Sequence, residues 1–95
     1  MVTHIVLFKL KDRSGESIAK TRAVLLSMKG KIECLRELTV EVDFLHTDLS
    51  YDIALIANFD SKEDLKAYAV HPVHVEIGKY IEDVQANITV VDYEI

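Results

Sequence analysis

Two histidines and a tyrosine lie close together around the only proline of the chain, in the segment AYAVHPVHVEIGKY. Tyr68 precedes His71 by three residues, and His74 follows His71 by three residues. An imidazole titrates near neutral pH and can accept or release a proton. A tyrosine hydroxyl can donate a hydrogen bond to a developing oxyanion. The segment therefore has residue types that could transfer a proton, a histidine as the base and Tyr68 as a hydrogen-bond donor.

The same two histidines, at positions i and i+3, could instead form part of a metal site. Catalytic zinc needs a third protein ligand, and no further histidine or acidic residue is clearly placed to join His71 and His74. We therefore expect neither a metal ion nor another cofactor. Both histidines also have structural alternatives. His71 precedes Pro72 and suits a helix N-cap, and His74 could cap or pack the helical segment that follows.

Hydrophobic patterning predicts four strands. Some runs are rich in β-branched and aromatic residues and apolar on both faces, whereas others alternate apolar with polar residues. In chain order the predicted strands are Val2–Leu10, about Arg36–Phe44, about Tyr51–Phe59 and about Asn87–Glu94. His4 lies on the first strand, on the side of Val6 and Phe8. A histidine in that place is either a hydrogen-bonded core residue or part of a cavity wall.

Two helical regions lie between these strands. The first is predicted over residues 15–28. The second begins after Ser61, in a sequence that resembles a capping box. Proline has no amide hydrogen and clashes with the preceding turn. The second helix should therefore break at His71–Pro72 and continue as a new segment to about Asp83.

The resulting order, β-α-β-β-α-β, is the ferredoxin-like pattern. This α+β fold has a four-stranded antiparallel sheet with the helices on one face. The first and third strands, and part of the fourth, also carry apolar residues on the face that the helices leave open. An exposed apolar sheet face favours association. We therefore expect a homodimer in which two sheets pack face to face.

Length, charge and cysteine content narrow the classes of function. The chain has 95 residues and a net charge of −5, which fits one domain over residues 1–95 and disfavours nucleic acid and anionic membranes as partners. No apolar run is long enough to span a bilayer, and the first residues do not resemble a signal peptide. Cys34 is the only cysteine and cannot form an internal disulfide, which favours a reducing cytoplasm.

With these elements placed, the chain resembles the stress-responsive A/B barrel (Dabb) family of dimeric α-β barrels. The resemblance rests on THIVLFKLKD at the start, YDIALIANFDSKEDLKAYAVHPVH in the second half and VVDYE at the end. It implies a dimeric barrel of ferredoxin-like subunits. It also implies a range of activities, because most members have no assigned reaction, some plant members are described as stress proteins of high stability, and one is a polyketide cyclase that catalyses an aldol condensation.

The resemblance to that cyclase implies roles for individual residues. The cyclase has a tyrosine and a His-Pro-x-His motif at the spacing of Tyr68, His71 and His74, and its tyrosine and second histidine are regarded as the acid/base pair. Tyr68 and His74 are therefore the expected catalytic residues. His4 matches a pocket histidine of the cyclase and is expected to bind ligand, with His71 as a second candidate. A further pocket histidine corresponds to Ile53 here, so the cyclase constellation is incomplete.

Three functions remain as alternatives. The first is a homodimer with a cavity between sheet and helices that holds a small apolar or carbonyl-containing ligand, with no specific activity assigned. The second is a proton-transfer enzyme on a carbonyl substrate, similar to a polyketide cyclase or a related dimeric-barrel oxygenase. The third is a non-catalytic stress-protective protein. A cavity shared by the Tyr68 hydroxyl and a His74 ring nitrogen would favour the first two, and a closed apolar core at His74 would favour the third.

Overall fold

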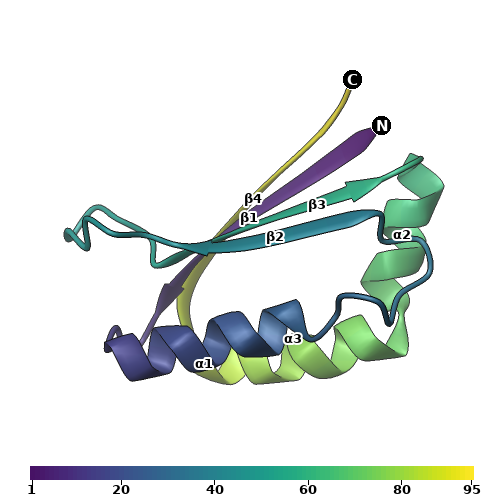
Figure 1. Ribbon diagram of the computed structural model, residues 1–95. Coiled ribbons are helices and arrows are strands. Elements are labelled where there is room, and N and C mark those ends of the chain that lie inside the picture. The colour runs from purple at the N-terminus through teal and green to yellow at the C-terminus, as the bar shows by residue number, and fades with distance from the viewer.

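The computed structural model describes residues 1–95 as one antiparallel sheet with three helices on one of its faces (Figure 1). The strands lie in the order β2-β3-β1-β4. Their bounds are Val2–Leu10 for β1, Glu37–Val42 for β2, Ile53–Phe59 for β3 and Gln85–Glu94 for β4. The helices are α1 (Gly15–Leu26), α2 (Lys62–Val70) and α3 (Pro72–Val84). The predicted ferredoxin-like α+β fold is confirmed.

Every predicted element is present, and the bounds differ by no more than two residues. The first helix ends at Leu26 rather than Met28, because the chain turns over the following residues and reaches a left-handed conformation at Gly30, with φ of 81°. The third strand begins at Ile53, two residues after the predicted start at Tyr51. Asp52 just before it is buried, where its carboxylate accepts a hydrogen bond from the backbone of Leu10. No helix is long and apolar enough to cross a membrane.

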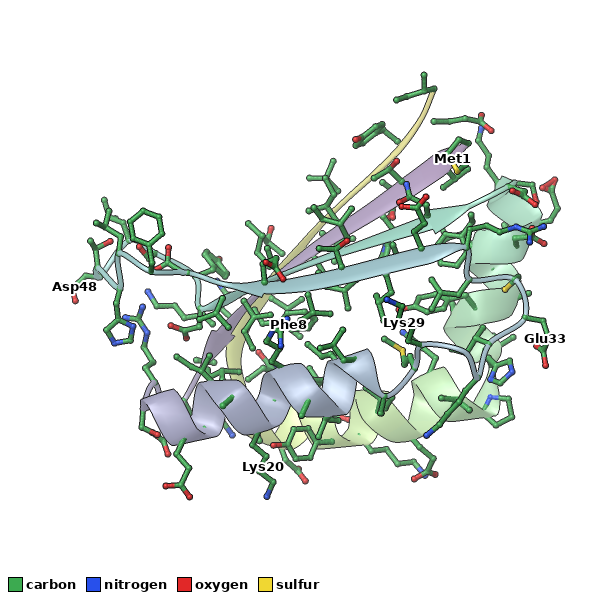
Figure 2. All side chains as sticks on the ribbon, viewed as in Figure 1. Met1, Phe8, Lys20, Lys29, Glu33 and Asp48 are labelled. Atoms are coloured by element: carbon green, nitrogen blue, oxygen red, sulfur yellow. The ribbon has the colours of Figure 1, made fainter.

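The hydrophobic core lies between the sheet and the helices. Alternate residues of β1 and β3 are buried against the helices, as the period of two in a strand requires. Figure 2 shows Phe8 of β1 directed into this layer and Lys20 of α1 directed away from the sheet. Each fully buried aliphatic or aromatic side chain of this kind stabilises the fold by about 1.5–3 kcal/mol.

No helix covers the opposite face of the sheet (Figure 1). Ile5 pairs with Ile56 on β3 and with Val91 on β4, so these three side chains share that face. We call it the outer sheet face and define it by Ile5, Leu7, Ile56, Val91 and Tyr93. Val91 is 58% exposed and Tyr93 44% exposed. The predicted apolar face away from the helices is therefore present and uncovered in the single chain.

A buried ion pair joins the connection between β1 and α1 to the connection between β2 and β3. The Nε of Arg13 donates to Oδ1 of Asp52 over 2.9 Å, and the backbone N–H of Leu10 donates to Oδ2 over 2.9 Å. The Nη2 of Arg13 also donates to the carbonyl oxygens of Thr47 and Ser50. Because the Asp52 carboxylate is fully buried, these donors replace the water that it loses on folding.

Candidate functional site

A cavity of about 440 Å³ lies between the sheet and the helices and reaches β4. This volume is within the usual range of small-molecule sites, about 300–1,000 Å³. The wall is mostly apolar, with side chains from β1, β3, β4 and all three helices. The polar groups at the cavity include His4, Tyr68 and His74. Three of the four residues predicted for the site therefore lie together on one cavity.

The break between α2 and α3 brings Tyr68 and His74 together. Within one regular helix, residues six positions apart would point in different directions. Here α2 ends at Val70, His71 has extended backbone with ψ of 136°, and Pro72 starts α3. The ring centroids of Tyr68 and His74 consequently lie 4.4 Å apart at an angle of 51°. Proline at the first helical position costs no hydrogen bond, because that N–H would have no helical partner.

Tyr68 lines this cavity and is almost fully buried. Its ring packs on Phe59 with centroids 4.9 Å apart, and its hydroxyl donates weakly to Sδ of Met28 over 3.7 Å. Burial, with a smaller contribution from the nearby Cys34, raises the pKa of Tyr68 to about 12. The hydroxyl therefore keeps its proton at neutral pH. A weak sulfur acceptor is its only partner, so a ligand oxygen can take its hydrogen bond.

His74 is arranged as a proton acceptor. Its Nδ1 lies 3.1 Å from the carbonyl oxygen of Ala69. A carbonyl oxygen only accepts, so Nδ1 carries the hydrogen, and Nε2 of the neutral ring has a free lone pair. Burial lowers the pKa of His74 below 6.5, and this effect outweighs the opposing hydrogen bond to Ala69. No buried side-chain nitrogen lacks a partner, so the unpartnered Nε2 of this half-buried ring is accessible from outside the protein.

His4 is held by a residue that the sequence did not identify. Its Nδ1 lies 2.5 Å from Oδ1 of Asp92, its cross-strand neighbour on β4. The ring of His4 stands edge-on to Tyr68 with centroids 5.9 Å apart. Asp92 belongs to the terminal VVDYE segment. In the sequence this segment contributed to the family resemblance, but it did not indicate a role for Asp92. Its role could be found only from the pairing of β1 with β4, because 88 residues separate the two side chains in the sequence.

The structure does not bring His71 to this cavity. Its Nδ1 accepts a hydrogen bond from the backbone N–H of Val73, so His71 is the N-cap of α3. Its Nε2 faces the carboxylate of Glu33, 3.5 Å away. The predicted ligand-binding role of His71 therefore has no support from the cavity wall. Ile53, at the position of the missing cyclase histidine, is 1% exposed and belongs to the core.

Gly78 leaves space in this cavity. It lies in the middle of α3, on the same side as His74 and Ile81, which line the cavity with it. Glycine inside a helix costs about 0.5–1 kcal/mol relative to alanine. No packing requires it, because a Cβ added at Gly78 would meet no atom within 4 Å. The missing side chain thus keeps open a volume that almost any other residue would partly fill.

Other polar groups offer no comparable site. A second pocket of about 480 Å³ lies beside the start of α1 and includes Arg13 and Arg22. Both guanidinium groups already bond to protein acceptors, Arg13 to Asp52 and Arg22 to the carbonyl oxygen of Val40. No cluster of three His, Cys, Asp or Glu side chains could hold a metal ion. Burial raises the pKa of the Cys34 thiol, which makes it a poor nucleophile.

Comparison with known proteins gives one consistent family. The family model described as the Stress Responsive A/B Barrel Domain (Dabb) matches residues 2–95. A stress-response A/B barrel domain-containing protein of Arabidopsis thaliana is 32% identical over 98 residues, which cover 98% of this chain and 46% of that protein. The chain thus spans about half the length of this relative.

Solved structures of similar proteins have the same fold. A dimeric protein of unknown function and ferredoxin-like fold from Bacteroides fragilis has a TM-score of 0.83 and 32% identity, and the match covers 99% of this chain and 95% of that one. The hydroxynitrile lyase of Passiflora edulis has a TM-score of 0.84 and 21% identity, and the match covers 99% of this chain and 92% of that one. The likeness to the lyase shows the fold alone.

Proposed function

This chain belongs to the stress-responsive A/B barrel (Dabb) family, and we propose that it is a homodimeric protein that binds a small, mainly apolar ligand in the cavity between its sheet and helices. The observation that carries this proposal is the free Nε2 of His74 at an apolar cavity of about 440 Å³. A closed, filled core at this point would instead have favoured a purely protective protein. Cys34, half-buried and without a disulfide partner, favours a reducing compartment such as the cytoplasm.

Self-association would cover the outer sheet face. That face is apolar on three strands and has no helix over it (Figure 1), and exposed apolar patches of this kind mark interaction sites. A protein of the same fold with 32% identity is dimeric. Two sheets stacked through this face would leave each cavity intact, because the cavity lies on the helix side of its own sheet.

Proton transfer on a carbonyl ligand is the second candidate function. It is favoured by the opposite protonation states of two adjacent groups, a His74 ring that burial keeps neutral and a Tyr68 hydroxyl that keeps its proton. Nε2 of His74 would take a proton from the carbon beside the carbonyl group, and the Tyr68 hydroxyl would donate a hydrogen bond to the enolate oxygen. A hydroxynitrile lyase shares this fold, so the fold can support an enzyme.

Acetophenone, a neutral aromatic ketone, is a suitable probe for ligand binding. Titration followed by ¹H–¹⁵N correlation spectra should shift the amide signals of Gly78 and Val90 at the cavity and leave Gly15 unchanged. The matched control is Gly78→Leu, which fills the cavity without a clash at Cβ and should remove the shifts. Equal shifts in the parent and in Gly78→Leu would contradict a cavity site.

The second function has its own readout with the same ketone. In deuterated water, a base in the cavity would exchange the methyl protons of acetophenone for deuterium, which NMR detects as loss of the methyl signal. We expect His74→Gln to slow this exchange by about 10²–10⁴-fold, the usual contribution of a general base. If the parent exchanged the methyl protons of acetophenone no faster than Gly78→Leu does, proton transfer would be contradicted and ligand binding alone would remain.

A further inference from the structure

We propose that the ligand of this cavity is an uncharged, mainly apolar molecule that carries a hydroxyl group, and that this hydroxyl donates to Nε2 of His4, whose other ring nitrogen, Nδ1, is bonded to Asp92. This inference rests on the proposed function, because it names the ligand class of the same cavity. It adds Asp92 as a positioning residue and His4 as a second acceptor beside His74.

The contact between His4 and Asp92 determines which ring nitrogen carries the hydrogen. A carboxylate can only accept, so Nδ1 of His4 is the donor in the 2.5 Å contact with Oδ1 of Asp92. In the neutral ring, Nε2 is then an acceptor. The His4 side chain is 15% exposed, and its Nε2 has no partner in the protein although no buried side-chain nitrogen is unsatisfied. Nε2 of His4 is therefore free for a ligand. In metal sites a carboxylate orients a histidine ring in the same way, by accepting the hydrogen of the ring nitrogen that does not bind the metal.

The two histidines present the same chemistry from opposite elements. His74 on α3 bonds through Nδ1 to the carbonyl oxygen of Ala69, and His4 on β1 bonds through Nδ1 to Asp92. Both rings contact Tyr68, with centroids 4.4 Å and 5.9 Å from the tyrosine ring. The polar part of the cavity thus contains two acceptor nitrogens beside the Tyr68 hydroxyl, which donates. A ligand hydroxyl suits this set, because it can both donate and accept a hydrogen bond.

The charges around the cavity disfavour an anionic ligand. No lysine or arginine lines the wall, and its one charged residue is Glu82. Asp92 adds a second negative charge directly behind His4, and its side chain is 44% exposed. A carboxylate ligand would lose water without gaining a cationic partner. A cationic ligand would leave water for a mostly apolar wall, and one of the two carboxylates is already bonded to His4.

Four probes with one apolar body separate these possibilities: benzyl alcohol, toluene, benzoate and benzylamine. Their dissociation constants follow from titrations monitored by ¹H–¹⁵N spectra of the parent protein. We expect benzyl alcohol to bind at least about fivefold more tightly than toluene, as a net hydrogen bond provides, and more tightly than benzoate or benzylamine. Toluene binding as well as the alcohol, or tighter binding of either charged probe, would overturn the hydroxyl class.

The role of Asp92 is tested by Asp92→Asn, whose amide can bond to either form of the His4 ring. We expect benzyl alcohol to bind about fivefold more weakly to this variant while toluene binds equally well. The ¹⁵N shifts of the His4 ring should change from the Nδ1–H form to a mixture of forms. Unchanged ring shifts together with unchanged alcohol binding would overturn the positioning role. Cavity shifts that persist in Gly78→Leu, or none with any probe, would instead contradict the proposed site itself.

Discussion

The ring centroids of Tyr68 and His74 lie 4.4 Å apart, although the two residues belong to different helices on either side of Pro72. The tyrosine belongs to the buried core, whereas the histidine is only partly buried. Burial acts in opposite directions on the two groups. It raises the pKa of Tyr68 to about 12 and lowers the pKa of His74, so burial favours the neutral form of both side chains.

The hydroxyl of Tyr68 should matter to chemistry more than to stability. Tyr68→Phe removes a hydroxyl whose partner is a weak sulfur acceptor, Sδ of Met28, so we expect the free energy of unfolding to change by less than about 1 kcal/mol. The same variant should slow ketone proton exchange. Tyr68→Ala is the control for the ring, and its cavity should cost about 3–5 kcal/mol. Urea unfolding measures the stability of both variants. A large loss of stability in Tyr68→Phe would contradict the prediction that the hydroxyl matters little to folding.

His74 should make the protein less stable at acidic pH. Its pKa is lowered in the folded state, so below pH 6.5 the unfolded chain binds the proton more readily than the folded protein. The contribution of His74 to the free energy of unfolding is therefore fully present above pH 6.5. It is lost as the pH falls from 6.5 to the lowered pKa of the folded state. In His74→Gln this contribution is absent, and the decrease in urea midpoint over that window should be smaller. If the urea midpoints of the parent and His74→Gln changed in parallel with pH, the predicted role of His74 in acid sensitivity would be disproved.

His71 should affect folding but not ligand binding. Its Nδ1 caps α3 through the N–H of Val73, and loss of a cap costs about 1 kcal/mol. His71→Ala should therefore unfold at lower urea concentration, whereas His71→Asn should recover most of the loss because asparagine caps well. The dissociation constant of acetophenone should be the same for all three proteins. Weaker binding to His71→Asn would restore the predicted ligand-binding role.

The buried ion pair of Arg13 with Asp52 should be sensitive to loss of one partner. Arg13→Met leaves a fully buried carboxylate without its cation, which we expect to cost about 3 kcal/mol or more. Arg36→Met is the matched control, because Arg36 pairs with Asp60 on the surface, where both side chains are more than half exposed. It should change thermal stability little. Equal effects of the two substitutions would contradict the role of burial.

The outer sheet face should control the oligomeric state. Ile56→Glu places a charge in the middle of this face, where two stacked sheets would have to bury it. Analytical ultracentrifugation should find a dimer for the parent and a monomer for the variant. Val70→Glu is the control, since Val70 is 75% exposed and belongs to α2 on the other side of the sheet. A monomeric parent, or a dimer unaffected by Ile56→Glu, would exclude this interface.

The local elements could be predicted because their causes are local. Alternation of apolar residues produces the strands, and Ser61 caps α2 through the N–H of Asp64 as its sequence predicts. The helix break needs only Pro72, because the conflict of proline with a continuing helix lies within one turn. The same local reasoning correctly placed His71 at a cap, and it correctly made the outer sheet face apolar.

The site depended on distances that no local pattern contains. Asp92 meets His4 because β4 pairs with β1 in one antiparallel register, and shifting that register by one residue would turn Asp92 to the other face. Gly78 leaves space in the cavity only because the fold places α3 and the strands around the same volume. The sequence by itself determined the strands, the helices and the break between Tyr68 and His74. Only the tertiary structure decided which side chains share the cavity, because strand register and helix packing are set by burial of the whole core and not by neighbours in the chain.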